Sequence, residues 1–192
     1  MSKQLFGTDG IRGIANQYPI TPEIALRIGR AVARILQSDG QGRHKVVIGK
    51  DTRLSGYMLE TALTSGLVSE GSRVLLTGPA PTPAVAHLTR SMGCDAGIML
   101  TASHNPYQDN GIKIFGSDGF KLNDALEHEI EKIILADDLP QPEGDLGKAI
   151  RIDDAMGRYI EFTKNAAGAN SLRGLKIVVD CAHGAAYYVG PL

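Results

Sequence analysis

Residues 96–106 read Ala-Gly-Ile-Met-Leu-Thr-Ala-Ser-His-Asn-Pro. The first five are apolar or small, and a short run of this kind that ends in polar turn residues is typical of a buried β-strand. The residues after it place the hydroxyl of Ser103 beside an imidazole and an amide, in a loop closed by proline. Loops at the carboxyl edge of a sheet commonly carry reactive side chains. This stretch therefore predicts a buried strand that delivers Ser103 to such an edge.

Helix and strand signals alternate along the rest of the chain. Thr21-Pro22 and Thr82-Pro83 are strong helix starts, because the threonine hydroxyl can cap the helix and proline fits its first turn. Asn123 is expected to cap a further helix. Periodicity and short apolar runs predict helices that begin near residues 21, 58, 82, 123 and 153, strands at 46–48, 74–76 and 175–180, and a hairpin of 111–115 with 120–122.

This alternation indicates an α/β fold with a mixed sheet. We expect residues 1–150 to form a mixed-sheet α/β domain with helices on both faces. Residues 151–192 are expected to hold a connecting helix and the incomplete start of a second, similar α/β domain. The reason is the apolar run at 175–180, which predicts a parallel strand buried on both faces. A chain of 192 residues can hold one good domain and part of another.

The composition argues against several classes of function. A net charge of −1, no tryptophan and no aromatic residues interleaved with basic ones argue against nucleic acid and anionic membranes as partners. No segment approaches the roughly 20 apolar residues of a membrane span, and no secretion signal is seen. Cys94 and Cys181 lie far apart in apolar surroundings, so we expect two buried, reduced thiols and a cytoplasmic protein.

Ser103 allows three interpretations from the residues alone. It could be a hydrolase nucleophile with His104 as base, but adjacent loop residues rarely face each other and the Gly-x-Ser-x-Gly elbow is missing. It could be a loop serine that only satisfies backbone groups, and spacing alone favours this interpretation. It could also carry a phosphoryl group, whose charge of roughly −1.5 to −2 requires nearby cations. Arg12, Lys113 and a divalent metal would meet that requirement.

Residues 6–13, Phe-Gly-Thr-Asp-Gly-Ile-Arg-Gly, form a second candidate cluster. Its three glycines allow a close approach of the backbone to a ligand, and Arg12 offers a rigid fork of donors suited to phosphate. A tight hairpin in which Asp9 and Arg12 pair with each other fits the same residues equally well.

Two further cationic positions have a structural and a functional interpretation. Lys113 alternates with isoleucines near the serine loop, and a solvated surface charge is its favoured interpretation. Residues 49–53, Gly-Lys-Asp-Thr-Arg, follow a predicted strand, where ligand groups gather in α/β proteins. They could equally be a charged helix lead-in with a surface pair between Asp51 and Arg53 that contributes little.

Taken together, these motifs resemble the α-D-phosphohexomutase family. The resemblance rests on residues 6–13, 49–53 and 101–106 together with Asn-Gly-Ile-Lys at 110–113 and Gly-Pro-Ala-Pro-Thr-Pro at 78–83, all in the family's order. It extends from about Phe6 to the end of the chain.

The resemblance implies roles for individual residues. Ser103 is implied to be phosphorylated in the active enzyme, with its phosphate as one ligand of a catalytic Mg²⁺. Arg12 is implied to hold the phosphoryl group, and Lys113 to take part in the acid–base chemistry. The resemblance further implies a catalytic position for His104 in the phosphoserine loop, and phosphate or substrate contacts from Arg12, Thr8, Asn105 and Lys113.

The activity implied by the resemblance is that of a phosphosugar mutase, an isomerase. It would convert glucosamine 6-phosphate to glucosamine 1-phosphate through a 1,6-bisphosphate, on the route to peptidoglycan precursors, with a hexosamine or hexose 1,6-bisphosphate as activator. Phosphoglucomutase and phosphomannomutase activities are alternatives within the family, and a non-catalytic phosphosugar-binding module is another. The oligomeric state stays open, because any amphipathic helix could form a homodimer interface.

The family's pattern also contains parts that these 192 residues lack. They are the Asp-Gly-Asp-x-Asp metal loop, the sugar-selecting loop and the C-terminal phosphate-binding domain. We therefore expect this stretch to present the phosphoserine half of the site and not to turn over substrate alone.

Overall fold

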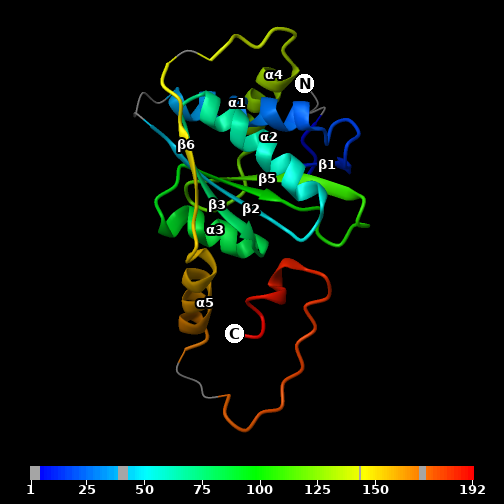
Figure 1. Cartoon of the computed structure of the whole chain (residues 1–192), viewed down its shortest axis with the longest axis vertical. Coiled ribbons are helices and arrows are strands. Elements are labelled where there is room, and N and C mark those ends of the chain that lie inside the picture. The colour runs from blue at the N-terminus through cyan, green and yellow to red at the C-terminus, as the bar shows by residue number, and fades with distance from the viewer. Residues whose placement is uncertain (1–4, 39–42, 143, 169–171) are drawn as a thin grey trace.

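A computed structural model describes residues 5–38, 43–142, 144–168 and 172–192 (Figure 1). Its six-stranded sheet has the strand order β1-β5-β4-β2-β3-β6. The strands are β1 (Ile11–Ile14), β2 (Lys45–Lys50), β3 (Arg73–Pro79), β4 (Ala96–Leu100), β5 (Asp109–Gly116) and β6 (Lys148–Arg151). The helices are α1 (Pro22–Gln37), α2 (Ser55–Ser69), α3 (Thr82–Ser91), α4 (Asp124–Leu135), α5 (Ala155–Ala166) and the 3₁₀-helix η1 (Ala185–Tyr187).

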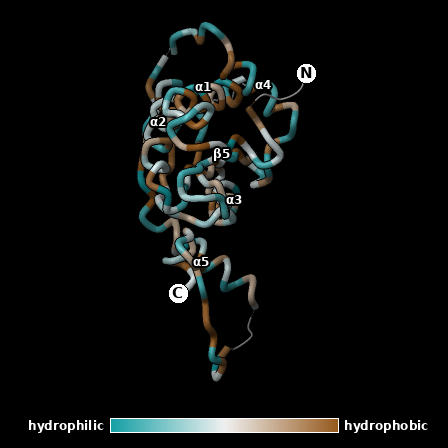
Figure 2. Tube along the Cα trace, turned by 90° about the vertical axis from the view of Figure 1, so that its right-hand side faces the viewer, coloured by the Kyte–Doolittle hydropathy of each residue, from teal (hydrophilic) through white to brown (hydrophobic). Residues whose placement is uncertain are grey.

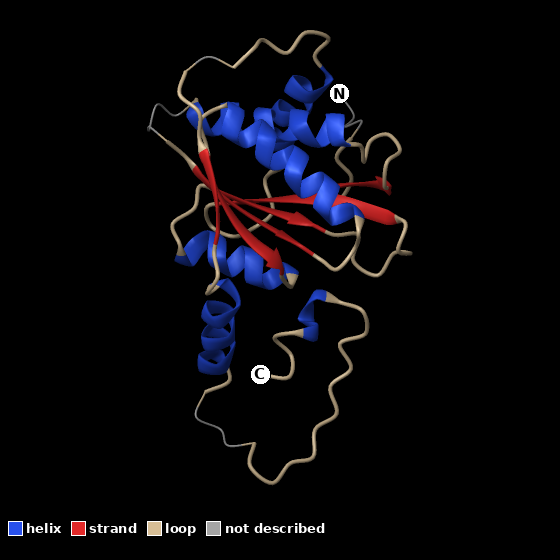
Figure 3. Ribbon diagram, in the orientation of Figure 1, coloured by secondary structure: helices blue, strands red, loops and turns tan. Residues whose placement is uncertain are grey.

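The sheet is mixed, as predicted. Strand β2 runs parallel to β3 and β4, and β3 runs parallel to β6. Strand β5 is antiparallel to both β4 and β1. The parallel strands β2, β3 and β4 therefore end at one common edge of the sheet, and β5 and β1 extend the sheet beyond β4 (Figure 3).

Helices cover both faces of the sheet, which confirms the predicted α/β fold. Helices α1, α2 and α4 lie on one face, and α3 lies on the other with α5 beyond it (Figures 1 and 3). Side chains of the strands contribute to two separate hydrophobic cores, one on each face of the sheet. Val46 and Ile48 of β2 pack with the first helix group, whereas Val47 packs with α3. No helix in the described residues is long and apolar enough to cross a lipid bilayer.

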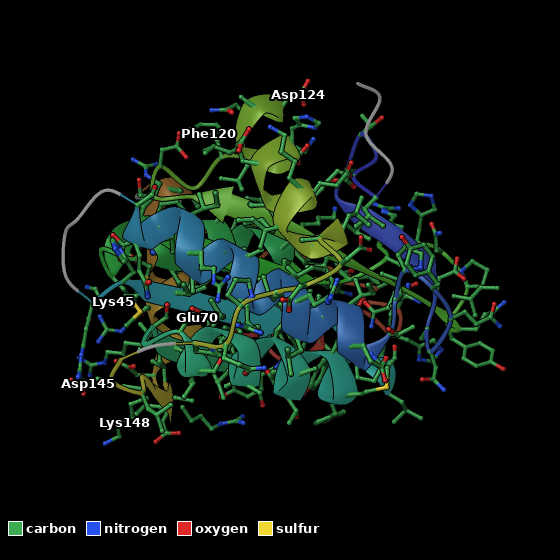
Figure 4. The ribbon with its side chains drawn as sticks, turned by 90° about the horizontal axis from the view of Figure 1, so that it is seen from above. Lys45, Glu70, Phe120, Asp124, Asp145 and Lys148 are labelled. Carbon is green, nitrogen blue, oxygen red and sulfur yellow. The ribbon has the colours of Figure 1, made fainter. Side chains whose placement is uncertain are left out.

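A buried ionic cluster fastens the helical layer to the connection after α4. Glu70, which follows α2 and is labelled in Figure 4, accepts hydrogen bonds from Nε of Arg30 at 2.7 Å and of Arg34 at 3.0 Å. Both arginines, which lie on α1, also donate to the carbonyl of Pro140. Pro140 lies between α4 and β6, so this connection is attached to α1.

Two of the three predicted helix caps are confirmed. The Thr21 hydroxyl accepts from the amide of Ile24 at 3.4 Å, and the Asn123 side chain accepts from Leu126 at 2.9 Å. The predicted cap at Thr82 is wrong, because α3 has Pro81 as its N-cap and has no side-chain cap. The Pro81 carbonyl accepts from residues 84 and 85, so the helix begins one residue earlier than the Thr-Pro pattern indicates.

The predicted hairpin is confirmed only in part, because its second arm is not a regular strand. Strand β5 forms, and residues 120–122 pair with it through the bridge between Phe115 and Lys121 and through backbone hydrogen bonds of Phe120 with Gly116 (2.9 Å) and of Leu122 with Ile114 (3.2 Å), but they do not form a strand of their own. Asn123 caps α4 two residues after that bridge, which leaves no length for a strand.

The strand predicted at 175–180 does not form. These residues make no strand, and Val178 is 96% exposed. A buried strand needs neighbouring strands and covering helices, and the described part of the chain supplies none beside this run. Figure 2 shows it as a brown, apolar length that extends away from the domain. The connecting helix is confirmed as α5, while the domain boundary at residue 150 and a second domain stay predictions.

The two cysteines are free, as predicted, but only Cys94 is buried, and Cys181 is partly exposed. Burial raises the pKa of the Cys94 thiol to about 11. At pH 8 roughly one thiol in a thousand would be ionised, and the thiolate is the reactive form. In the folded protein we expect iodoacetamide to label Cys181 first, with Cys94 reacting only after unfolding in urea. Mass spectrometry of the two peptides measures this order, and equal native labelling would contradict it.

Gly97 in β4 shows how tightly α3 lies on the sheet. A Cβ atom there would lie 2.1 Å from the Thr89 hydroxyl of α3. We expect Gly97→Ala to destabilise the domain by about 1–3 kcal/mol, because the helix must shift. Gly157→Ala is the matched control, since a Cβ at that helical position meets nothing within 4 Å. The control should raise stability slightly. Thermal unfolding measures both, and equal midpoints would refute the close contact.

Candidate active site

The carboxyl edge of the parallel strands brings the serine loop next to the segment after β2. The amide of Asp51 donates to the carbonyl of Leu100 at 2.9 Å. The Thr101 hydroxyl, one residue beyond β4, donates to Asp51 Oδ2 at 2.7 Å. The predicted delivery of Ser103 to this edge is therefore confirmed.

Ser103 is exposed and has a left-handed backbone, with φ of 56°. This conformation is sparsely populated by residues other than glycine, and sparsely populated backbone regions cost about 1–3 kcal/mol where the surroundings impose them. The amide of Ser103 donates to the Thr101 hydroxyl at 2.9 Å. Its Oγ lies 3.3 Å from Nδ1 of His104. Our expectation that these neighbours would not face each other is wrong, and His104 lies within hydrogen-bond reach of the serine.

Asp9 joins the two cations that the sequence singled out. Its carboxylate accepts from Nζ of Lys113 at 2.7 Å and from the guanidinium of Arg12. Arg12 also approaches Asn105 Oδ1 at 3.5 Å, which links this cluster to the serine loop. The Asp9–Arg12 pairing, which the sequence left as one of two alternatives, is present, and it is linked to the loop that carries Ser103 through Asn105.

The charge balance of this cluster holds Asp9 ionised at neutral pH. Partial burial raises the pKa of the Asp9 carboxyl, but the contacts with Lys113 and Arg12 outweigh burial and hold the pKa below its ordinary value. The ion pairs therefore stabilise the fold above the pKa of about 3.9 of an unfolded aspartate. That contribution is lost as pH falls through the lowered folded value.

Backbone geometry fixes the segment that carries Arg12. Gly10 has φ of +84°, and a Cβ there would lie 2.4 Å from the Ile112 carbonyl of β5. Only glycine permits both the conformation and this close approach. Before the turn, the amides of Leu5 and Phe6 donate to Glu131 of α4 at 2.8 and 3.1 Å. The segment is therefore held between β5 and α4.

Lys113 and Thr8 differ in how they are presented. Lys113 is opposite Met99 in the β4–β5 register, and its side chain is only 15% exposed. Its favoured interpretation as a solvated surface charge is therefore wrong. Thr8 is exposed in the turn closed by the bridge between Gly7 and Gly10.

The pair between Asp51 and Arg53 is not a surface pair. Its side chains are 12% and 9% exposed, and Arg53 donates to backbone carbonyls of the serine loop. Sequence reasoning undervalued these two residues and missed Thr101. The available signal was their position directly after buried strands, where side chains from separate strands meet.

A cavity of about 940 Å³ opens at this edge of the sheet. Ser103, Asn105 and Arg53 line one side of it, and residues 182–186 line the other. The Thr52 hydroxyl donates to the His183 carbonyl, which joins the two sides. This volume is in the range of small-molecule sites.

The described residues do not by themselves form a metal centre. No group of three or more His, Cys, Asp or Glu among them could hold a metal ion. The carboxylates at the site are engaged with cations instead, Asp9 with Lys113 and Asp51 with Arg53.

Comparison with known proteins places this site in a family. Residues 3–141 match the family model described as phosphoglucomutase/phosphomannomutase, alpha/beta/alpha domain I. The chain belongs to the phosphoglucomutase/phosphomannomutase family. The resemblance to α-D-phosphohexomutases is therefore confirmed, and the matched residues include the loop that carries Ser103.

Relatives and solved structures agree with this family. The phosphoglucosamine mutases of Paracoccus denitrificans and Syntrophotalea carbinolica are 58% and 59% identical to this chain over its full length. The chain spans 43% of the length of each. The crystal structure of a putative phosphomannomutase from Thermus thermophilus superposes with a TM-score of 0.72 at 30% identity. That match covers 86% of this chain and 36% of the other.

Proposed function

We propose that the full-length protein is a phosphosugar mutase that interconverts glucosamine 6-phosphate and glucosamine 1-phosphate. The observation that carries the proposal is the exposed, left-handed Ser103 at the edge of a cavity, beside Asn105 and the Arg12–Asp9–Lys113 cluster. The amino sugar is favoured because relatives 58–59% identical over the whole chain are named phosphoglucosamine mutases.

The proposed reaction moves a phosphoryl group twice. Phosphorylated Ser103 transfers its phosphoryl group to O1 of glucosamine 6-phosphate, and the O1 proton passes to the serine oxygen. The resulting 1,6-bisphosphate turns around, its 6-phosphoryl group returns to Ser103, and the serine proton passes to the sugar O6. This second transfer restores the phosphoserine and leaves glucosamine 1-phosphate, so the reaction needs no net phosphate. An added hexose 1,6-bisphosphate would phosphorylate Ser103 in protein molecules that lack the phosphate, and so activate them.

The side chains of the site supply positioning and charge, which dominate phosphoryl transfer. We assign Arg12 to the transferring phosphoryl group, because its fork of donors suits phosphate and it lies beside Asn105. Lys113 and His104 are the candidates for proton transfer, since His104 Nδ1 lies 3.3 Å from Ser103 Oγ. Thr8 and Asn105 are proposed to contact the substrate phosphate.

Mg²⁺ would be held only in part by the phosphate of Ser103. A full set of ligands would need further carboxylates, because the described residues contain no suitable group.

The two free cysteines fit a reducing compartment, and we place the protein in the cytoplasm, with a phosphosugar as its partner. A homodimer stays a proposal without a selected interface.

An assay of the full-length protein tests the proposed function. Glucosamine 6-phosphate should be converted to glucosamine 1-phosphate with Mg²⁺, faster after addition of glucose 1,6-bisphosphate. Glucose and mannose 6-phosphates serve as comparators. If either comparator is turned over faster, that sugar and not the amino sugar is the preferred substrate. If the protein binds the three sugar phosphates but turns over none of them, it is a non-catalytic module.

A further inference from the structure

Arg53 lies in the segment before α2, and its side chain extends to the serine loop. All three nitrogens of its guanidinium donate hydrogen bonds, to Asp51 and to the loop. A guanidinium has five N–H donors. Its side chain is 9% exposed, so water has little access to these donors. The five contacts are Nε to Asp51 at 2.9 Å, Nη1 to the carbonyls of Pro106 and of Asp109 (2.9 Å), and Nη2 to the carbonyls of Ser103 (3.0 Å) and Asn105 (2.9 Å).

The same arginine also fixes the amide side of Ser103. Asp51 accepts from the amide and Nε of Arg53 at 3.0 and 2.9 Å. Asp51 in turn accepts from the Thr101 hydroxyl, which accepts from the amide of Ser103. Both peptide groups that flank Ser103 are therefore tied to Arg53. These are the constraints that a left-handed serine requires, because surrounding contacts must impose that conformation.

We propose that Arg53 is a positioning residue that holds Ser103 in its left-handed conformation for phosphoryl transfer. Arg53 lines the cavity, but its donors are already used on Asp51 and the loop, so it acts through Ser103 and not on the substrate. The inference rests on the proposed function and extends it. It predicts a loss in the rate of transfer with little change in substrate affinity.

Arg53→Lys in the full-length protein tests whether the planar guanidinium is needed to hold Ser103 in place. Lysine keeps the charge but has three donors and no planar geometry, so it cannot hold four carbonyls and Asp51 together. We expect kcat for glucosamine 6-phosphate to fall roughly 100-fold, as for a misplacement of about 1 Å. The KM should stay within about threefold of wild type, because the Arg53 donors are used on Asp51 and the loop and do not contact the substrate. Single-turnover phosphorylation of Ser103 by glucose 1,6-bisphosphate should slow by the same factor as kcat.

Arg30→Lys is the matched control. Arg30 lies on α1, and its side chain is also 9% exposed. It pairs with the carboxylate of Glu70 and donates to the carbonyl of Pro140, so it does not contact the serine loop. It should lower the unfolding temperature about as much as Arg53→Lys and leave kcat unchanged.

Thr101→Val provides a second route where Arg53→Lys fails to fold. It keeps the side-chain shape and removes only the hydroxyl between Asp51 and Ser103. A folded variant with reduced kcat and unchanged KM supports the inference, and one with wild-type kcat overturns it. Likewise, a folded Arg53→Lys protein with wild-type kcat overturns it. Absence of turnover and of Ser103 phosphorylation in the wild type would instead overturn the proposed function.

Discussion

Ser103→Ala in the full-length protein is expected to abolish mutase activity while the domain stays folded. The variant removes the only atom that accepts and returns the phosphoryl group in the proposed reaction. We expect kcat to fall on the order of 10⁴-fold or more, as when a nucleophile is deleted. Stability should change by less than about 1 kcal/mol, because Ser103 is exposed and its hydroxyl contacts the exposed side chain of His104.

Ser117→Ala is the matched control for this experiment. Ser117 is also an exposed loop serine, in the turn after β5. Its variant should have wild-type kcat. Turnover retained by Ser103→Ala would remove the phosphoserine from the mechanism, and a large loss in both variants would show that the substitutions act through the fold.

Arg12→Ala is expected to have the second largest effect. Arg12 is the cation that contacts both Asp9 and the loop residue Asn105. Loss of one charge-stabilising donor at a transition state costs roughly 10²–10³-fold, and we expect kcat/KM for glucosamine 6-phosphate to fall by that factor. Arg12→Lys should recover only part of the loss, because lysine lacks the bidentate fork.

Arg158→Ala separates this effect from a general loss of surface charge. Arg158 pairs with Asp154 on α5, and both side chains are more than half exposed. Such a pair contributes little to stability. We expect unchanged kinetics in this variant. If Arg12→Ala has the same kcat/KM as Arg158→Ala, Arg12 does not handle the phosphoryl group.

Local patterns were sufficient to predict the elements that position the site. The strand before Ser103, the α1 cap at Thr21 and the α4 cap at Asn123 depend on neighbouring residues, and all three are confirmed. Local patterns failed where the structure of a segment depends on residues that are far away in the sequence. The apolar run at 175–180 reads as a strand, but strand formation depends on a pairing partner that the described residues lack.

The same limit applies to the candidate site. Ser103, Arg12 and Lys113 could be singled out from the order of their motifs and the family resemblance, whereas spacing alone favoured a loop serine and a surface lysine. The role of Arg53 could not, since its contacts join residues 50 to 56 positions apart in sequence. Its exposure depends on how the serine loop folds over it. The sequence left open whether Asp51 and Arg53 form a surface pair, and the structure has a largely buried arginine that donates to backbone carbonyls of the loop.

Phosphopeptide mass spectrometry of the peptide that contains Ser103 tests the central claim most directly. The full-length protein would be analysed before and after incubation with glucose 1,6-bisphosphate and Mg²⁺. We predict phosphate on Ser103, increased by the bisphosphate and lost again when glucosamine 6-phosphate is added without bisphosphate and the released 1,6-bisphosphate is removed. A peptide without phosphate under every condition, in a protein that still binds the sugar phosphate, would contradict the phosphoserine mechanism.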